Sequence, residues 1–277
     1  MDFRIGIIGI VGCICAVSFL PAPAAGQETV AEKDHPWARF QPGAWRKVRI
    51  VTEALDEAGD VVGSSVTESS SYLIDVSETS YALEIDTSVE VAGKRLPSKL
   101  QLEELDLPAD LGLAGEDSDY KLVGTATYAI DDKRIPCEVF EKQDDTPDGN
   151  RVTKIYYAAN FSPRIVKQEQ ITTGANGDAP LDELTESIVA IDMPYRLSSG
   201  IVPTWQTKRQ RKGPKGSTVA IEIHSSTIPG GLVAQSTKEL DAAGRVLRRS
   251  TLELIDYGLE SERALQRRRV FRSRRNR

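Results

Sequence analysis

The sequence predicts a mainly β protein in which antiparallel strands form one strongly curved sheet or a half-open β-barrel, with one or two short helices. Between residues 81 and 91, apolar or β-branched side chains occupy every second position, which is typical of a half-buried antiparallel strand. Turn-forming residues separate β-rich runs along the whole of 45–257. Because twist accumulates between neighbouring strands, a sheet of about ten or more long strands has to curl, close or split.

The N-terminus has the organisation of a secretory signal peptide. One arginine supplies the short charged region, and residues 5–20 form an uncharged apolar run of 16 residues. Ala22 and Ala24 then give an A-x-A pattern, so we expect cleavage near Ala24–Gly26 and an exported protein, periplasmic or secreted. An uncleaved anchor is an alternative, but the run is shorter than the roughly 20 residues that span a bilayer.

Cysteine usage adds a second alternative for the N-terminus. The stretch that ends at Cys13 resembles a lipobox, so a lipoprotein attached through Cys13 is a minor alternative to cleavage. Otherwise Cys13 and Cys15 leave with the signal peptide, and the mature chain keeps only Cys137. An internal disulfide is then impossible, and stability has to come from buried apolar surface.

Charge is distributed unevenly along the chain. The net charge is −6, yet residues 263–277 carry eight arginines and no acidic residue, and residues 27–262 sum to −14. A basic tail on an acidic body predicts contact with an anionic envelope surface or with the body itself. Nucleic acid is not an expected partner, because the protein is exported and its body is acidic. The candidate anionic contacts are Arg267, Arg268, Arg269, Arg272, Arg274 and Arg275.

The chain divides into a signal peptide (1–26), a loose N-terminal segment (27–39), one β domain (40–257) and an Arg-rich C-terminal tail (258–277). In the first half of the β domain, we expect strands at 45–55, 61–76, 81–91, 96–102, 120–130 and 135–141. Residues 103–118 contain one proline and two glycines, so we expect one or two helical turns there instead of a strand. Residues 143–150 are expected to form a surface loop.

The second half of the β domain contains two similar segments, 150–193 and 216–257, which we interpret as an internal repeat of one β unit. In each segment a β-rich run leads to a proline, Pro163 or Pro229, and a second run follows. The apolar spacing in 181–191 also fits a helix, but the parallel with the second copy favours a strand.

Three short stretches suggest local structure. Trp37, Phe40 and Trp45 lie within nine residues and are expected to cap an open end of the core, with a ligand-stacking platform as the alternative. The Pro-Gly-Gly sequence at 229–231 is expected to form a bulge or sharp bend, with the close approach of a ligand as the alternative. Residues 208–215, between the two copies, are expected to form a basic loop.

Few residues are suited to catalysis. Glu222 and His224 share a face of an expected strand and could form half a metal site, but no third ligand is identifiable. Cys137 is expected to be a small buried hydrophobic residue rather than a nucleophile paired with His224. The sequence has no nucleophile elbow, P-loop or dinucleotide-binding motif. We therefore predict no enzymatic activity, no metal and no cofactor, with a hydrolase as the remote alternative.

The run of long strands, the strand–proline–strand pattern of 155–172, and the turn at 239–245 followed by 251–257 together resemble the lipoprotein-carrier (localisation-factor) superfamily of exported proteins. The resemblance implies a half-open β-barrel in which a curved sheet wraps short helices and an apolar cavity holds lipid or acyl chains. The chain also looks like uncharacterised exported bacterial proteins with a Trp-rich start and a Pro-Gly-Gly turn.

This resemblance implies a non-enzymatic protein that binds an apolar or acyl ligand, or a lipoprotein-like envelope component, on the concave face of its sheet. The candidate apolar inner face consists of Tyr81, Leu83, Ile85, Val89 and Val91. The alternative is a structural or interaction module of the cell envelope that uses the basic tail.

Overall fold

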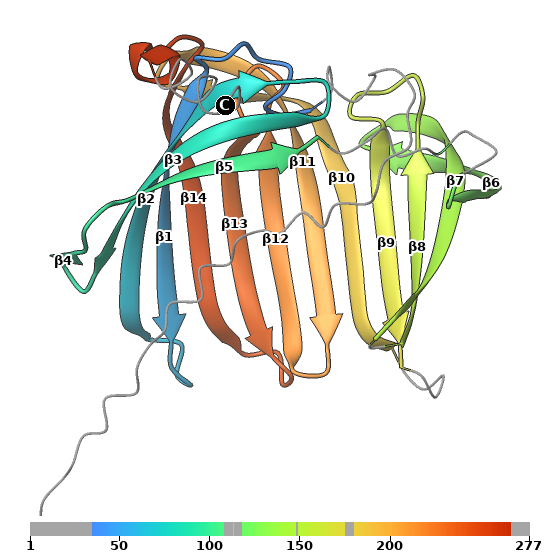
Figure 1. Ribbon diagram of the computed structural model, residues 1–277. Helices are drawn as coiled ribbons and strands as arrows, with labels where there is room; N and C mark the ends of the chain where they lie inside the picture. Colours follow the sequence, from blue (N-terminus) through green and yellow to red (C-terminus); the bar gives the residue numbers. More distant parts are fainter. Residues whose placement is uncertain (1–34, 108–112, 114–117, 148, 175–179, 267–277) are drawn as a thin grey trace, which may run out of the picture.

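The structure is a computed structural model that describes residues 35–107, 113, 118–147, 149–174 and 180–266. The predicted signal peptide, most of the predicted loose segment and the tail arginines from Arg267 onward lie outside the described residues. One antiparallel sheet dominates the fold (Figure 1). Its strands are β1 (Trp45–Leu55), β2 (Val61–Val76), β3 (Ser80–Val91), β4 (Lys94–Arg95), β5 (Lys99–Asp106), β6 (Lys121–Ile130), β7 (Lys133–Thr146), β8 (Gly149–Tyr157), β9 (Ile165–Thr173), β10 (Pro180–Leu197), β11 (Gly200–Gly213), β12 (Gly216–His224), β13 (Leu232–Asp241) and β14 (Val246–Gly258).

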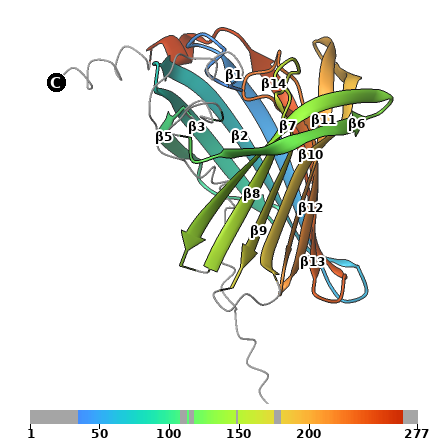
Figure 2. The same cartoon turned by 90° about the vertical axis from the view of Figure 1, so that its right-hand side faces the viewer.

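The strands follow the order β4-β3-β2-β1-β14-β13-β12-β11-β10-β9-β8-β7-β6, and β5 pairs with β3. The pairing of β1 with β14 places the first and last strands side by side in the interior of the sheet. The sheet is strongly curved and does not close, which confirms the predicted fold class (Figure 2). A short helix follows β14 at residues 262–266. No helix in the described part of the chain has the length and apolar character to cross a membrane.

One end of the sheet curls back on itself. The tip of the β6–β7 hairpin reaches β10, although β8 and β9 lie between them in the sheet. Lys133 Nζ lies 2.6 Å from Asp192 Oδ2, and the Tyr128 hydroxyl donates a hydrogen bond of 3.2 Å to the Ile188 carbonyl oxygen. An apolar cluster lies beneath these contacts and includes Cys137, so this hairpin closes over a packed core.

The two faces of the sheet differ in burial, as a single cross-strand row shows. The row runs through directly paired positions on β1, β14, β13, β12, β11 and β10, namely Ile50, Leu252, Gln235, Glu222, Thr207 and Ile188. Its members are buried or half-buried, whereas Thr251, Ser236 and Lys208 on the opposite face are exposed. We call the face that carries this row the buried face. The row is apolar at its two ends and polar in its middle.

An N-terminal segment covers the buried face at the β2–β3 end. Trp37 is 6% exposed and packs with Ala44, Leu73 and Leu83, with Phe40 at the edge of the same cluster. Trp37 and Phe40 therefore cap the core as predicted, whereas Trp45 stacks on Tyr72 at 6.2 Å between ring centres and is not part of this cluster. Trp37 and Ala38 fall in the segment that was expected to be loose, yet both are buried.

The Pro-Gly-Gly sequence forms a sharp bend next to this cap. Gly230 and Gly231 have φ angles of 76° and 73°, a region that glycine adopts without the strain of a side chain. The Arg46 guanidinium donates a hydrogen bond of 3.1 Å to the Gly230 carbonyl oxygen and stacks over the Trp37 ring at 5.4 Å. The Gly230 amide donates to the Pro36 carbonyl oxygen at 2.9 Å. The bend is confirmed, and it is an arginine of the same chain that approaches the glycine backbone closely.

The expected basic loop at 208–215 is wrong, because β11 continues to Gly213. Ion pairs with β10 stabilise the extended conformation. Arg209 Nη2 lies 2.9 Å from Glu186 Oε2, and Arg211 Nε lies 2.7 Å from Asp182 Oδ1. These acidic residues lie more than 20 positions away in the sequence, so the local pattern of the basic run could not identify them as partners.

Two other boundaries differ from expectation. Residues 103–106 belong to β5 and form no helical turn, because they pair with β3, where Leu105 lies opposite Tyr81. The loop expected at 143–150 is mostly strand, since β7 extends to Thr146 and β8 begins at Gly149, which pairs with Thr146. In both places, pairing with a neighbouring strand extends the β structure into polar residues.

The two predicted repeat copies have the same arrangement of strands. β8–β10 and β12–β14 are each three successive antiparallel strands. The first loop of each copy is closed in the same way: the Ala158 amide donates to the Arg164 carbonyl oxygen at 2.8 Å, and the Ser225 amide donates to the Gly231 carbonyl oxygen at 2.7 Å. Residues 181–191 lie within β10, which confirms the strand interpretation. The internal repeat itself stays a prediction.

Candidate functional site

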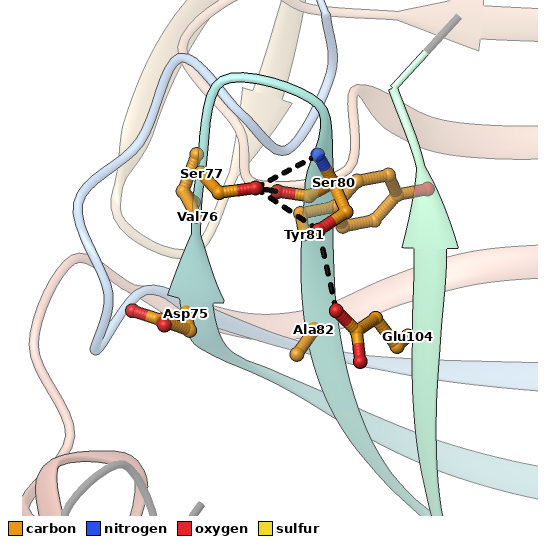
Figure 3. Close-up of a pocket in the computed structure, with 7 residues that line it drawn as sticks. All are labelled: Asp75, Val76, Ser77, Ser80, Tyr81, Ala82 and Glu104. Atoms are coloured by element: carbon orange, nitrogen blue, oxygen red, sulfur yellow. Dashed lines mark hydrogen bonds between the residues drawn. The ribbon is translucent and has the colours of Figure 1, made fainter. Parts of the chain in front are cut away.

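A shallow notch lies between β2, β3 and β5 (Figure 3). It is an indentation of the surface and does not enclose room for a water molecule. Its lining consists of Asp75, Val76, Ser77, Ser80, Tyr81, Ala82 and Glu104. Ligand pockets for small molecules usually enclose roughly 300–1,000 Å³, so this notch is not a cavity of that kind, although two carboxylates lie at it.

The turn between β2 and β3 shapes the notch. The Ser77 hydroxyl oxygen accepts a hydrogen bond of 2.9 Å from the Ser80 amide, and the two serine hydroxyls are 3.0 Å apart. The Ser80 hydroxyl donates to Glu104 Oε1 at 3.3 Å. These contacts hold the Glu104 carboxylate of β5 beside the β2–β3 turn, as Figure 3 shows.

Register brings further carboxylates to the same face. Ala82, Glu84 and Asp86 alternate along β3, so they share one face, and Glu104 and Asp106 on β5 lie opposite Ala82 and Ser80. Asp75 lies opposite Ala82 on the other side. We call this group the acidic patch; it consists of Asp75, Glu84, Asp86, Glu104 and Asp106. It lies on the opposite face from Leu83 and the Trp37 cap.

The C-terminal helix docks on the acidic patch. Ala264 is 1% exposed and packs against Ile74 and Ala82. Arg263 Nε donates a hydrogen bond of 2.9 Å to Glu84 Oε1 and Arg263 Nη2 one of 3.3 Å to Asp86 Oδ2. The same helix therefore combines apolar burial with a charged anchor.

The Arg263 guanidinium is held by more than ion pairing. It lies 4.8 Å above the centre of the Tyr72 ring, which favours a cation. Burial on its own lowers the pKa of Arg263, but the hydrogen bonds to Glu84 and Asp86 outweigh burial, so the pKa is raised. The Glu84 side chain is only 5% exposed. The Arg263 side chain itself is 41% exposed, so the buried carboxylate of Glu84 is the fixed partner of this charge-assisted hydrogen bond.

The predicted tail contacts, from Arg267 to Arg275, lie outside the described residues. The structure describes the residues that hold the start of the tail, Arg263 and Ala264, and sequence reasoning missed both as anchors. The signal that could have found them was an alanine and a leucine inside an otherwise Arg-rich segment. The acidic partners of Arg263 on β3 lie nearly 180 residues earlier, so the pattern alone could not identify them.

The predicted apolar inner face lies on the buried face of β3. Leu83 is 5% exposed, and Tyr81 and Ile85 pack against the same cluster as Trp37. Val89 is half-buried, and Val91 is 46% exposed at the end of the strand. The chain's own N-terminal segment therefore covers the first three residues, and the last two extend beyond it. Their role in binding a ligand stays a prediction.

Glu222 and His224 meet as their spacing predicts. His224 Nε2 lies 3.0 Å from Glu222 Oε2, and Gln235 Nε2 donates to Glu222 Oε1 at 2.9 Å. Burial on its own raises the pKa of Glu222, but the bonds from His224 and Gln235 and the charge of Arg209 outweigh it and lower the pKa. His224 also stacks on Trp205 at 5.5 Å between ring centres. The second oxygen of Glu222 therefore binds an amide, and the described residues include no group of three or more metal-ligating side chains.

Cys137 is a buried core residue, as predicted. It is 4% exposed and its thiol donates to the Ile135 carbonyl oxygen at 3.3 Å. Burial raises the pKa of the thiol, which is the opposite of the shift that activates a nucleophilic cysteine.

No protein-family model matches this chain, and no curated protein matches it. Two solved structures align with most of it. A candidate exported protein with a YmcC-like fold from Bacteroides fragilis is 10% identical, with a TM-score of 0.31; the alignment covers 79% of this chain and 97% of that one. A candidate lipoprotein from Parabacteroides distasonis is 13% identical, with a TM-score of 0.32, and the alignment covers 81% of this chain and 99% of that one.

Proposed function

We propose that the protein is an exported, non-enzymatic interaction module of the cell envelope that contacts an anionic envelope surface through its Arg-rich C-terminal segment. The observation that carries the proposal is the docking of the C-terminal helix: Ala264 is buried and Arg263 is bound to Glu84 and Asp86. Because the helix is fixed to the sheet, the segment that follows starts from a defined place on a rigid body.

The charge of that segment supports the choice of partner. Residues 267–277 carry seven arginines and no acidic residue, in addition to the anchoring Arg263. A basic residue near an anionic membrane surface contributes on the order of 1 kcal/mol, and this attraction decays within about 10 Å at moderate salt. Seven arginines therefore suffice for reversible, salt-dependent binding without insertion into the membrane.

Cosedimentation with lipid vesicles tests the proposal. We expect the protein to bind phosphatidylcholine vesicles that contain phosphatidylglycerol, to bind pure phosphatidylcholine vesicles much more weakly, and to release as salt is raised. A chain that ends at Gln266 keeps the anchor and should lose this binding. Replacing the seven arginines by lysine should preserve binding, whereas replacing them by glutamine should abolish it. Equal binding by the shortened chain would overturn the proposal.

A further inference from the structure

The place where the tail begins is fixed on the acidic patch. The helix at 262–266 packs Ala264 on Ala82, and Arg263 binds Glu84 and Asp86 of the same strand. Residue 267 therefore follows directly from a helix that is seated on β3. The first cation of the C-terminal region is already bound to carboxylates of the patch, which demonstrates that the patch accepts a guanidinium.

The surface next to this anchor has the chemistry to accept more of the same segment. Glu104 and Asp106 of β5 continue the acidic patch beyond Glu84. Leu100 and Leu102 of β5 lie opposite Asp86 and Glu84 on this face and are 48% and 51% exposed. These two neighbouring leucines give the face an apolar surface that an additional segment can cover.

β5 is also an edge strand. Its pairing partner is β3, and no other strand of the described residues pairs with it. An edge strand presents unpaired backbone N–H and C=O groups, which can accept an additional extended segment. The eight residues of β5 span about 26 Å at 3.3 Å per residue.

Residues 267–277 match this surface in charge, composition and length. Their sequence, RRRVFRSRRNR, contains seven arginines for the carboxylates and two apolar residues, Val270 and Phe271, for the leucines. Eleven residues in extended conformation reach up to about 36 Å, which exceeds the length of β5. The segment can therefore start at the anchored helix and run along the whole edge strand.

We propose that residues 267–277 dock on the acidic patch and edge strand β5 of their own chain. The arginines bind the carboxylates of Glu104 and Asp106, and Val270 and Phe271 cover Leu100 and Leu102. The docked segment is then unable to contact a second anionic surface with the same arginines. The acidic patch then competes with the envelope surface for the tail, a regulatory role that rests on the proposed function. An envelope surface binds the tail only when its negative charge is high enough to displace the tail from the patch.

A disulfide-trapping experiment in the mature protein, without residues 1–26 but with the complete C-terminal segment, tests the docking directly. Cysteines are introduced as Leu102→Cys and Phe271→Cys, while buried Cys137 is retained. The control pairs Phe271→Cys with Leu247→Cys on β14, where Leu247 is 49% exposed. Under mild oxidation we expect an intramolecular disulfide, detected by peptide mass, in the first pair and little in the control. Equal yields in the two pairs, or no disulfide with Leu102→Cys, would overturn the proposal.

A second measurement separates docking from the proposed function. The double variant Glu104→Gln/Asp106→Asn removes two charges from the patch, and Glu253→Gln/Asp256→Asn removes two exposed charges elsewhere. We expect the first variant to bind phosphatidylglycerol vesicles at least about fivefold more tightly than the second, a typical size for coupling between two sites. It should also form the 102–271 disulfide severalfold less. If no variant binds vesicles, the proposed function fails, but the disulfide yields still decide whether the tail docks.

Discussion

The Arg46 guanidinium packs directly against the backbone of Gly230. A Cβ atom on Gly230 would lie 2.7 Å from Arg46 Cζ, which is closer than real Cβ contacts. Arg46 also donates to the Gly230 carbonyl oxygen and stacks on Trp37. The first strand, the N-terminal cap and the Pro-Gly-Gly bend are therefore joined at one side chain.

We expect Gly230→Ala to destabilise the protein by about 2–4 kcal/mol, because it combines backbone strain at positive φ with a clash against Arg46. Gly244→Ala is the matched control, since Gly244 has a φ of 82° and a Cβ atom added to it would meet nothing within 4 Å. The control should lose only about 1–2 kcal/mol. Urea unfolding measures both. Arg46→Ala should reduce the additional loss at Gly230, and purely additive effects would contradict the clash.

His35 should make stability depend on pH between about 4 and 6.5. Its Nδ1 accepts hydrogen bonds from the Trp37 and Ala38 amides at 3.2 and 3.1 Å, so it has to be unprotonated in the folded state. Burial, assisted by the charge of Arg39, lowers the pKa of His35 to about 4. Between pH 6.5 and 4, His35 is therefore protonated in the unfolded chain but not in the folded chain. The free energy of unfolding consequently falls as pH drops from 6.5 towards 4.

The size of this effect is at most about 3–4 kcal/mol, since each unit of pKa shift corresponds to about 1.4 kcal/mol. In the variant His35→Asn, the amide oxygen can accept the same bonds but does not titrate. We expect it to lose less stability than the wild type between pH 6.5 and 4.5 in urea unfolding. If both proteins lose stability in parallel across this range, His35 is not the titrating group.

Cys137 should react with thiol reagents only after unfolding. It is 4% exposed, and burial raises the pKa of its thiol, so little thiolate is present or accessible at neutral pH. In native buffer, we expect labelling by a water-soluble disulfide reagent to be at least about 100-fold slower than in urea. The rate is then limited by the small fraction of molecules in which the core around Cys137 has opened. Rapid labelling of the folded protein would mean that the β6–β7 hairpin opens readily.

Native mass spectrometry tests the acyl-ligand hypothesis. The central members of the cross-strand row, Thr207, Glu222 and Gln235, are polar, and the notch between β2 and β5 is small and acidic. Both features disfavour an acyl chain, so we expect a single bare mass for protein purified gently from its host envelope. A heterogeneous added mass that is lost on organic extraction would restore the lipid-carrier hypothesis.

The sequence was most informative where local pattern decides structure. The strands at 45–55 and 61–76 have the predicted bounds, and the alternation in 81–91 identified β3 within one residue. It failed where a distant partner decides structure. The basic residues of β11 are extended because acidic residues of β10 lie opposite, and the acidic patch exists because β5 returns to β3.

The same reason limits prediction of the site. Glu222 and His224 were paired correctly because two residues on one strand share a face at fixed spacing. The anchor at Arg263 depends on Glu84 and Asp86, far away in the chain, and no local pattern links them. The sequence therefore shows which side chains of one strand share a face. It does not show which side chains meet across segments whose pairing is unknown.

The pairing of β1 with β14 has a consequence for how the chain acquires its structure. Trp45 lies opposite Gly258, so one ladder in the sheet interior joins the two ends of the β domain. Contacts of such separation form slowly, because a long loop has to close first. While the chain emerges from the ribosome or a translocon, β1 can pair with β2 on one side. The backbone N–H and C=O groups on its other side stay unpaired until β14 has been made. The complete sheet can form only after synthesis of β14, and a truncation within β14 should leave two separate sheets with aggregation-prone edges.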